Sequence, residues 1–303
     1  FTLVFIGVLV GFPTFQSIFL HNNTLRIESP LPEFLTKILP NVLGDSTFWK
    51  PTNEVITSEQ KPMVTAEGAL SYDLTTNKFL YQKNPKKRLP LASLTKIMTA
   101  LVALENRSFS DELIVGREAA SVGENSMGLS EGETYTLGEL LYGLILHSGN
   151  DAAETIAQES RFGRENFIYL MNKKAEDLGL SDTHFTNPSG LEGDGNQYST
   201  TYDLLVMTKH ALENPTFARI VSTVKYEIPY SSKHKYLYLF NETNLLTSYS
   251  GVKGVKTGYT DEAGLCLVTY LEYGGHRIIA VLLNAENRRQ EMKDLLDYSL
   301  KTL

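Results

Sequence analysis

Cysteine and positive charge are both scarce in this chain of 303 residues. Its single cysteine, Cys266, cannot form an intramolecular disulfide, and we expect it to be a small apolar residue inside a strand. With 28 basic against 35 acidic residues the net charge is −7, and no basic run with aromatics offsets it, which argues against a nucleic-acid partner. The six histidines are dispersed and no His-Glu-x-x-His string occurs, so a zinc peptidase is disfavoured and we expect neither a metal nor a cofactor.

One long apolar run is present, over residues 1–20. About 20 such residues suffice to span a bilayer. No small-x-small cleavage site stands out after the run, which favours an uncleaved transmembrane anchor over a removed signal segment. Residues 21–64 carry five prolines and scattered polar residues, a composition that predicts a spacer with one short helix over residues 33–39.

Three short strings follow in order: Ser93-Leu94-Thr95-Lys96, Ser148-Gly149-Asn150 and Lys256-Thr257-Gly258. Ser-x-Asn and Lys-Thr-Gly each occur once, but Ser-x-x-Lys occurs five times, so context must select among its matches. Only Ser93 opens a long apolar run, residues 97–104, which predicts a buried helix. The four matches without such a helix begin at Ser58, Ser222, Ser232 and Ser250.

A helix start suits Ser93 chemically. Residues three apart lie on the same face of a helix, so Ser93 and Lys96 can bring a hydroxyl and an amine together. The free backbone N–H groups at a helix N-terminus can also receive a developing oxyanion.

The other two strings lie in different local contexts. Ser148-Gly149-Asn150 falls between helical patterns over residues 137–146 and 151–157. A connection between two helices can present a hydroxyl and an amide to a cleft, but these residues could instead simply cap the second helix. Lys256-Thr257-Gly258 precedes two strand-like runs joined by Gly274-Gly275, which predicts a β-hairpin. The lysine string is therefore expected on or beside a strand, where its glycine lets a substrate backbone come close. Pattern alone predicts a mixed α and β fold.

In this order the three strings resemble the serine-type D-Ala-D-Ala carboxypeptidases, the low-molecular-mass penicillin-binding proteins. The likeness covers residues 65–298 and includes Asn187-Pro188-Ser189-Gly190-Leu191 and Tyr198-Ser199-Thr200. One departure is Gln197, where many members carry histidine, and it leaves the catalytic set intact. The resemblance implies an α+β fold, in which an antiparallel sheet is flanked by helices and a helical part closes one side of the cleft. We expect this catalytic domain over residues 65–303, after the apolar N-terminal helix and the spacer.

The resemblance implies acyl transfer through Ser93, and the residues present suit that chemistry. Lys96, if neutral, would remove the Ser93 proton, which requires its pKa to fall by about three units. Burial and the nearby charge of Lys256 would both lower it. Ser148 would pass a proton to the departing amine, and Asn150 would orient the substrate amide or Lys96.

Candidates to hold the substrate lie on the third string and near the C-terminus. Backbone N–H groups of Ser93 and Tyr259 would form the oxyanion hole. Arg288 could grip a carboxylate with a bidentate fork, although Arg289 is equally plausible, and His147 is a less favoured candidate base than Lys96. The expected substrate-binding residues are Lys256, Thr257, Gly258, Tyr259 and Arg288.

We therefore expect a carboxypeptidase that trims peptidoglycan stem peptides ending in D-Ala-D-Ala, is inhibited by β-lactams and is anchored in the cell envelope outside the cytoplasmic membrane. A D,D-endopeptidase that cuts peptidoglycan crosslinks would use the same residues and stays open. A β-lactamase would need efficient deacylation, and Glu192 lies in the right interval, but its surroundings resemble the carboxypeptidase loop. A non-catalytic sensor of wall peptides or β-lactams would not need an intact nucleophile and base.

Overall fold

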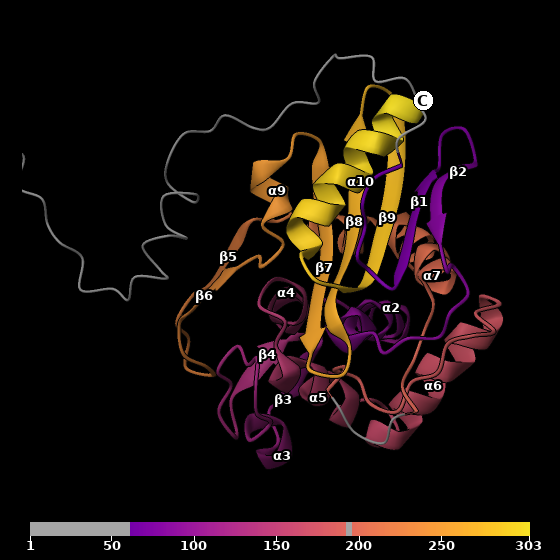
Figure 1. Ribbon diagram of the computed structural model, residues 1–303. Helices are drawn as coiled ribbons and strands as arrows, with labels where there is room; N and C mark the ends of the chain where they lie inside the picture. Colours follow the sequence, from indigo (N-terminus) through magenta and orange to yellow (C-terminus); the bar gives the residue numbers. More distant parts are fainter. Residues whose placement is uncertain (1–60, 192–195) are drawn as a thin grey trace, which may run out of the picture. The chain divides into compact units, whose positions relative to one another are not determined.

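The computed structural model describes residues 61–191 and 196–303, all within one compact unit, and Figure 1 shows their elements. The predicted anchor over residues 1–20, the helix over residues 33–39 and Glu192 lie outside the described residues. No helix in the described ranges combines the length and the apolar composition that a membrane crossing requires.

An antiparallel sheet of five strands, in the order β2-β1-β9-β8-β7, is the centre of this unit. β8 (Gly264–Tyr273) and β9 (His276–Ala285) are joined by Gly274 and Gly275, whose φ angles are 60° and 85°. Two left-handed residues are what a tight hairpin turn needs, and the hairpin predicted from the sequence is confirmed. The other strands of the sheet are β1 (Gly68–Asp73), β2 (Lys78–Lys83) and β7 (Val252–Thr260).

Both faces of the sheet are buried, as the side chains of β9 illustrate. Ile278 and Leu282 belong to a core cluster shared with α10 (Arg288–Thr302), which packs across one face (Figure 1). Ile279 and Leu283 belong to a larger cluster built with helices on the opposite face. Because successive side chains of a strand point to opposite faces, a strand covered on both sides is apolar without interruption.

α2 (Lys96–Asn106) is buried along most of its length in that larger cluster. The sequence predicted a helix opening at Ser93, but the chain first makes a tighter 3₁₀ turn, η2 (Ala92–Thr95), and continues as α-helix from Lys96. η2 packs against β7 and β8, so the start of α2 lies beside the sheet. The other helices are α3 (Arg117–Ala120), α4 (Leu137–Leu146), α5 (Asn150–Gln158), α6 (Gly163–Asp177), α7 (Thr201–Glu213), α8 (Pro215–Val221) and α9 (Leu245–Ser248).

The break between helices predicted around Ser148 is confirmed, since α4 ends at Leu146 and α5 begins at Asn150. Ser148 has a left-handed φ of 58°, which turns the chain sharply between the two helices. Two small two-stranded antiparallel sheets complete the described fold: β3 (Glu112–Ile114) with β4 (Thr134–Thr136), and β5 (Lys225–Ile228) with β6 (Leu237–Phe240).

Candidate active site

Ser93 and Lys96 meet at the junction of η2 and α2. Their spacing of three residues puts the side chains on one side of the turn, and Lys96 Nζ lies 2.9 Å from Ser93 Oγ. Ser93 is half-buried and lines a cavity, whereas Lys96 is fully buried. A serine hydroxyl open to a cavity and an amine shielded from water are thus in direct contact.

Lys96 Nζ has two further partners, and both can only accept a hydrogen bond. It lies 2.7 Å from Asn150 Oδ1 and 2.7 Å from the backbone carbonyl oxygen of Ser189. The Asn150 amide is oriented by Nδ2, which donates to the Gly123 carbonyl at 3.1 Å. A neutral amine has two N–H bonds, and these two acceptors take both. Its lone pair then faces the Ser93 hydroxyl, which is the arrangement a general base needs.

The two lysines of the site have lowered pKa values. Burial lowers the pKa of Lys96 well below that of a free lysine, and the positive charge of Lys256 lowers it further, against the opposing carboxylate of Glu242. Burial also lowers the pKa of Lys256, to about 8, with Glu242 opposing the shift and Arg288 adding to it. The shift favours the neutral form of Lys96, which is the form that can act as a base, whereas a pKa of about 8 leaves Lys256 mostly charged at neutral pH.

Lys256 links β7 to the connection between α4 and α5. Its Nζ lies 3.0 Å from Ser148 Oγ and 3.1 Å from the carbonyl oxygen of Thr257. Arg288, the first residue of α10, donates from Nη1 to the Gly258 carbonyl at 2.6 Å. Two cationic groups therefore reach the same part of β7, where an anionic group of a ligand would be attracted.

The predicted residues converge on one cavity of about 260 Å³. Lys96 and Lys256 lie buried beside it, bonded to the Ser93 and Ser148 hydroxyls that line it. His147 is the residue that follows α4, and neither it nor Arg289 is among the described residues that line this cavity. The predicted residues that do line it are Ser93, Ser148, Asn150, Thr257, Gly258, Tyr259 and Arg288.

Close backbone packing explains two glycines of the site. Gly190 has a left-handed φ of 88°, and an added Cβ would lie 1.9 Å from the carbonyl oxygen of Ala92. A Cβ added to Gly258 would lie 3.2 Å from the backbone nitrogen of Ser93. Both segments therefore press directly against the turn that carries the nucleophile.

Sequence reasoning missed the polar side chains that complete the cavity, among them Glu124, Asn125 and Glu242. The loop with Glu124 and Asn125 is held by Asp151, whose carboxylate accepts from Ser126 Oγ and from the backbone N–H groups of residues 127–129. Asp151 stands beside the second string in the sequence, but nothing local indicates that its partners begin 25 residues earlier.

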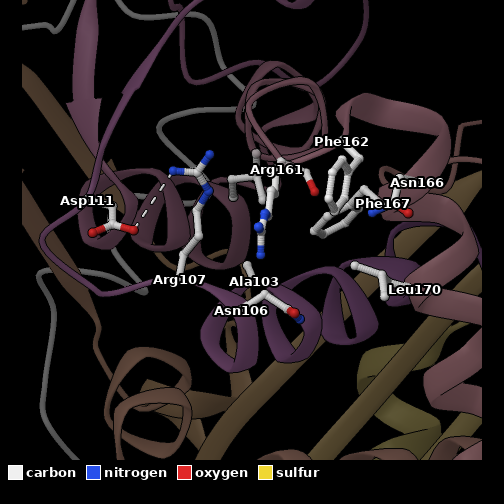
Figure 2. A pocket seen from close by; sticks show the side chains of 11 residues that line it. Ala103, Asn106, Arg107, Asp111, Arg161, Phe162, Asn166, Phe167 and Leu170 are labelled. Atoms are coloured by element: carbon white, nitrogen blue, oxygen red, sulfur yellow. Dashed lines mark ion pairs between the residues drawn. The ribbon is translucent and has the colours of Figure 1, made fainter.

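A larger cavity of about 520 Å³ lies at the far end of α2 from Ser93. Figure 2 shows Arg107 and Arg161 extending into it, with Phe162 and Phe167 beside them. None of the predicted site residues lines this cavity, so we assign the acyl-transfer chemistry to the smaller one. Among the described residues, no group of three or more histidine, cysteine or acidic side chains could hold a metal ion.

A serine paired with a buried lysine, on a helix start packed against an antiparallel sheet, defines a serine peptidase of the penicillin-recognising kind when Ser-x-Asn and Lys-Thr-Gly border the same cavity. The chain belongs to the D-alanyl-D-alanine carboxypeptidase family, whose model matches residues 55–287.

Curated relatives agree with this assignment. The D-alanyl-D-alanine carboxypeptidase DacF of Bacillus subtilis is 37% identical over 242 residues, which are 77% of this chain and 62% of that protein. The D-alanyl-D-alanine carboxypeptidase DacB2 of Mycobacterium tuberculosis is 35% identical over 70% of this chain and 72% of its own length. This chain therefore spans less than two thirds of the B. subtilis relative.

Solved structures show the same fold. The Streptomyces K15 DD-transpeptidase has a TM-score of 0.75 and 33% identity over 80% of this chain and 99% of its own. Penicillin-binding protein D2 from Listeria monocytogenes, in its cefotaxime-bound form, has a TM-score of 0.70 and 30% identity over 80% of this chain and 100% of its own. The expected antiparallel sheet with flanking helices is confirmed as the fold of the DD-peptidases.

Proposed function

We propose that this chain is a serine D-Ala-D-Ala carboxypeptidase that removes the terminal D-alanine from peptidoglycan stem peptides and is acylated by β-lactams at Ser93. The observation that carries the proposal is Lys96 Nζ, 2.9 Å from Ser93 Oγ, with its other two partners both acceptors. Membership of the family supports the substrate class.

Acylation begins with the Lys96 lone pair, which takes the Ser93 proton as Ser93 Oγ attacks the carbonyl carbon between the two D-alanines. Backbone N–H groups of Ser93 and Tyr259 receive the negative charge that develops on the carbonyl oxygen. The proximity of Gly258 to the Ser93 nitrogen supports this pairing of backbone segments.

For the terminal D-alanine to leave, its amine must receive a proton while its carboxylate stays bound. Ser148 delivers the proton and is restored through Lys256, which is 3.0 Å away. Lys256, Thr257 and Arg288 attract the carboxylate. The proton that Lys96 took from Ser93 replaces the one that Lys256 gave to Ser148, so that both lysines return to their starting states. Lys96 then takes a proton from water as the water oxygen attacks the acyl carbon, and it returns that proton to Ser93 Oγ as the ester bond breaks.

The test is D-alanine release from a stem-type peptide ending in D-Ala-D-Ala. Ser93→Ala is expected to reduce kcat/KM on the order of 10⁴-fold or more, because it removes a covalent nucleophile. Ser232→Ala is the matched control: it alters an exposed serine of another Ser-x-x-Lys match and leaves the rate unchanged. Equal release by the Ser93→Ala variant would end the proposal.

Transfer of the acyl group to an amine is a second candidate, favoured by the structural likeness to the Streptomyces K15 DD-transpeptidase. The two functions share the acyl-enzyme and differ in what attacks it. Adding an amino acceptor to the same assay separates them, since transpeptidation yields an elongated peptide in place of the shortened one. If the enzyme cleaves a crosslinked stem-peptide dimer but releases no D-alanine from the stem-type peptide, it is an endopeptidase instead.

We further propose that residues 1–20 anchor the chain and residues 21–64 space its catalytic unit from the outer side of the cytoplasmic membrane. The length and apolar composition of the first segment support the anchor. Expressed in bacteria, the full chain should stay with the membrane fraction after an alkaline wash, and recovery in the soluble fraction would contradict the anchor.

A further inference from the structure

Gln197 joins the loop over residues 186–191 to the turn of the nucleophile through both ends of its amide. Its Oε1 accepts from the backbone N–H groups of Thr186 and Asn187, at 2.8 and 3.0 Å. Its Nε2 donates to Thr95 Oγ1 in η2 at 3.2 Å and to Asn187 Oδ1 at 3.3 Å. The amide thus uses two acceptor and two donor positions, which is its full capacity.

Asn187 extends this restraint to Ser189. Asn187 Oδ1 accepts from Ser189 N at 3.1 Å, from Ser189 Oγ at 3.2 Å and from Gly190 N at 2.7 Å. The Pro188 carbonyl accepts from Thr99 Oγ1 of α2 at 2.6 Å. The Ser189 carbonyl, one of the acceptors around Lys96, therefore takes its position from a network that Gln197 anchors.

Thr95 extends the restraint in the other direction, to the residue before the nucleophile. Its hydroxyl accepts from Gln197 and donates to the Ala92 carbonyl at 2.9 Å. Ala92 has a left-handed φ of 46°, a conformation that costs energy for a residue with a side chain. The same Ala92 carbonyl is the atom against which Gly190 packs.

We infer that Gln197 is a positioning residue for acylation. It holds the Ser189 carbonyl and the Ser93 turn in one arrangement, so that the lone pair of Lys96 faces Ser93 Oγ. Gln197 is not among the described residues lining the 260 Å³ cavity, so it acts through its neighbours and not on the substrate. The inference rests on the proposed function, because it assumes that Lys96 activates Ser93.

The first variant is Gln197→Leu, which is similar in size and removes all four hydrogen bonds. The assay measures the rate constant for acylation by a β-lactam, separately from the dissociation constant of the preceding non-covalent complex. Acylation is expected to slow on the order of 100-fold, the cost of a misplacement near 1 Å. Non-covalent binding should change less than about threefold, because the carboxylate-binding residues are untouched. Unchanged acylation would overturn the inference.

Asn172→Leu provides a matched control. The Asn172 side chain, in α6, makes two hydrogen bonds to the backbone of Phe185. Its Nδ2 donates to the carbonyl oxygen at 2.7 Å, and its Oδ1 accepts from the N–H group at 2.9 Å. It therefore holds the chain just before the 186–191 loop but makes no hydrogen bond to η2. The control should lower the denaturation midpoint while acylation stays near the unaltered rate. If both variants lose acylation in proportion to lost stability, the role of Gln197 is only structural.

Thr95 tests the link to the nucleophile directly, even if Gln197→Leu fails to fold. Thr95→Val keeps the shape without the hydroxyl and should slow acylation, whereas Thr95→Ser keeps the hydroxyl and should not. If Gln197→Leu folds, it can be combined with Thr95→Val. The double variant should be acylated no more slowly than the slower of the two single variants, because both substitutions remove the same hydrogen bond between residues 197 and 95. Fully additive losses, or equal rates for Thr95→Val and Thr95→Ser, contradict the inference. No acylation of the unaltered protein would instead defeat the proposed function.

Discussion

The two lysines of the cavity both have pKa values below that of a free lysine. Burial lowers the pKa of both, and each also has a cationic neighbour, Lys256 beside Lys96 and Arg288 beside Lys256. Each unit of pKa shift corresponds to about 1.4 kcal/mol between the charged and neutral forms. The lowered pKa favours the neutral form of Lys96 that can serve as a base, while Lys256, with a pKa of about 8, is mostly charged at neutral pH and can attract a carboxylate.

The kcat/KM for D-alanine release is expected to fall as pH rises above about 8, where Lys256 loses its proton. The protonated form is the one that attracts the substrate carboxylate, so each further pH unit reduces the competent fraction about tenfold. A peptide with an amidated C-terminus has no such carboxylate, so its alkaline decline should be shallower and reflect only the part that Lys256 plays in restoring the Ser148 proton. A profile for the carboxylate substrate that stays flat to pH 10 would show that the Lys256 charge is not required.

At the scale of elements, the site depends on a loop that packs backbone against backbone on η2. Gly190 and the Ala92 carbonyl leave no room for a side chain between them. This packing fixes the loop over residues 186–191 against η2, with the acceptor and the nucleophile that they carry both within hydrogen-bond distance of Lys96.

Gly190→Ala is expected to disturb both folding and acylation. Its φ of 88° costs about 1–2 kcal/mol for any L-residue, and its Cβ also displaces the Ala92 carbonyl. Gly179→Ala is the matched control, since Gly179 has a φ of 70° but nothing within 4 Å of an added Cβ. Urea unfolding should show destabilisation of both variants, while stopped-flow β-lactam acylation should slow only for Gly190→Ala. Equal acylation by the two variants would refute the proposed coupling.

At the scale of the whole described unit, one sheet separates two apolar clusters, so opening the sheet exposes both. Cys266, the single cysteine of the chain, lies fully buried in β8. Burial raises the pKa of its thiol to about 11, so few thiolates form even at pH 8.

Cys266 should therefore report global unfolding. Without denaturant, a thiol reagent at pH 8 is expected to label it at least about 1000-fold more slowly than a free thiol, because labelling requires the sheet to open. In urea, the labelling midpoint should coincide with the loss of ellipticity. Rapid labelling of the native protein would mean that β8 opens locally.

Patterns that act over a few residues were predictable from the sequence. The Gly274-Gly275 turn and the break around Ser148 follow from turn chemistry and periodicity. The contact between Ser93 and Lys96 lies within a single helical turn, so its spacing was sufficient. The 3₁₀ form of η2 was not predicted, because residues three apart share a face in a 3₁₀ turn as they do in an α-helix, so the Ser93–Lys96 spacing suits both.

Site groups that are far apart in the sequence could be identified only from the tertiary structure. The Ser189 carbonyl is a backbone atom with no sequence signature, and it reaches Lys96 across 93 residues. Arg288 lines the cavity where Arg289 does not, and Glu242 faces both lysines from a loop that carries no motif.

The sequence by itself determined the nucleophile, its lysine and the strings that border the site, because their order and spacing are written along the chain. Only the tertiary structure decided which acceptors surround Lys96 and how far its pKa falls. Desolvation and charge depend on separation in space, and that separation exists only once the loop over residues 186–191 has closed onto η2.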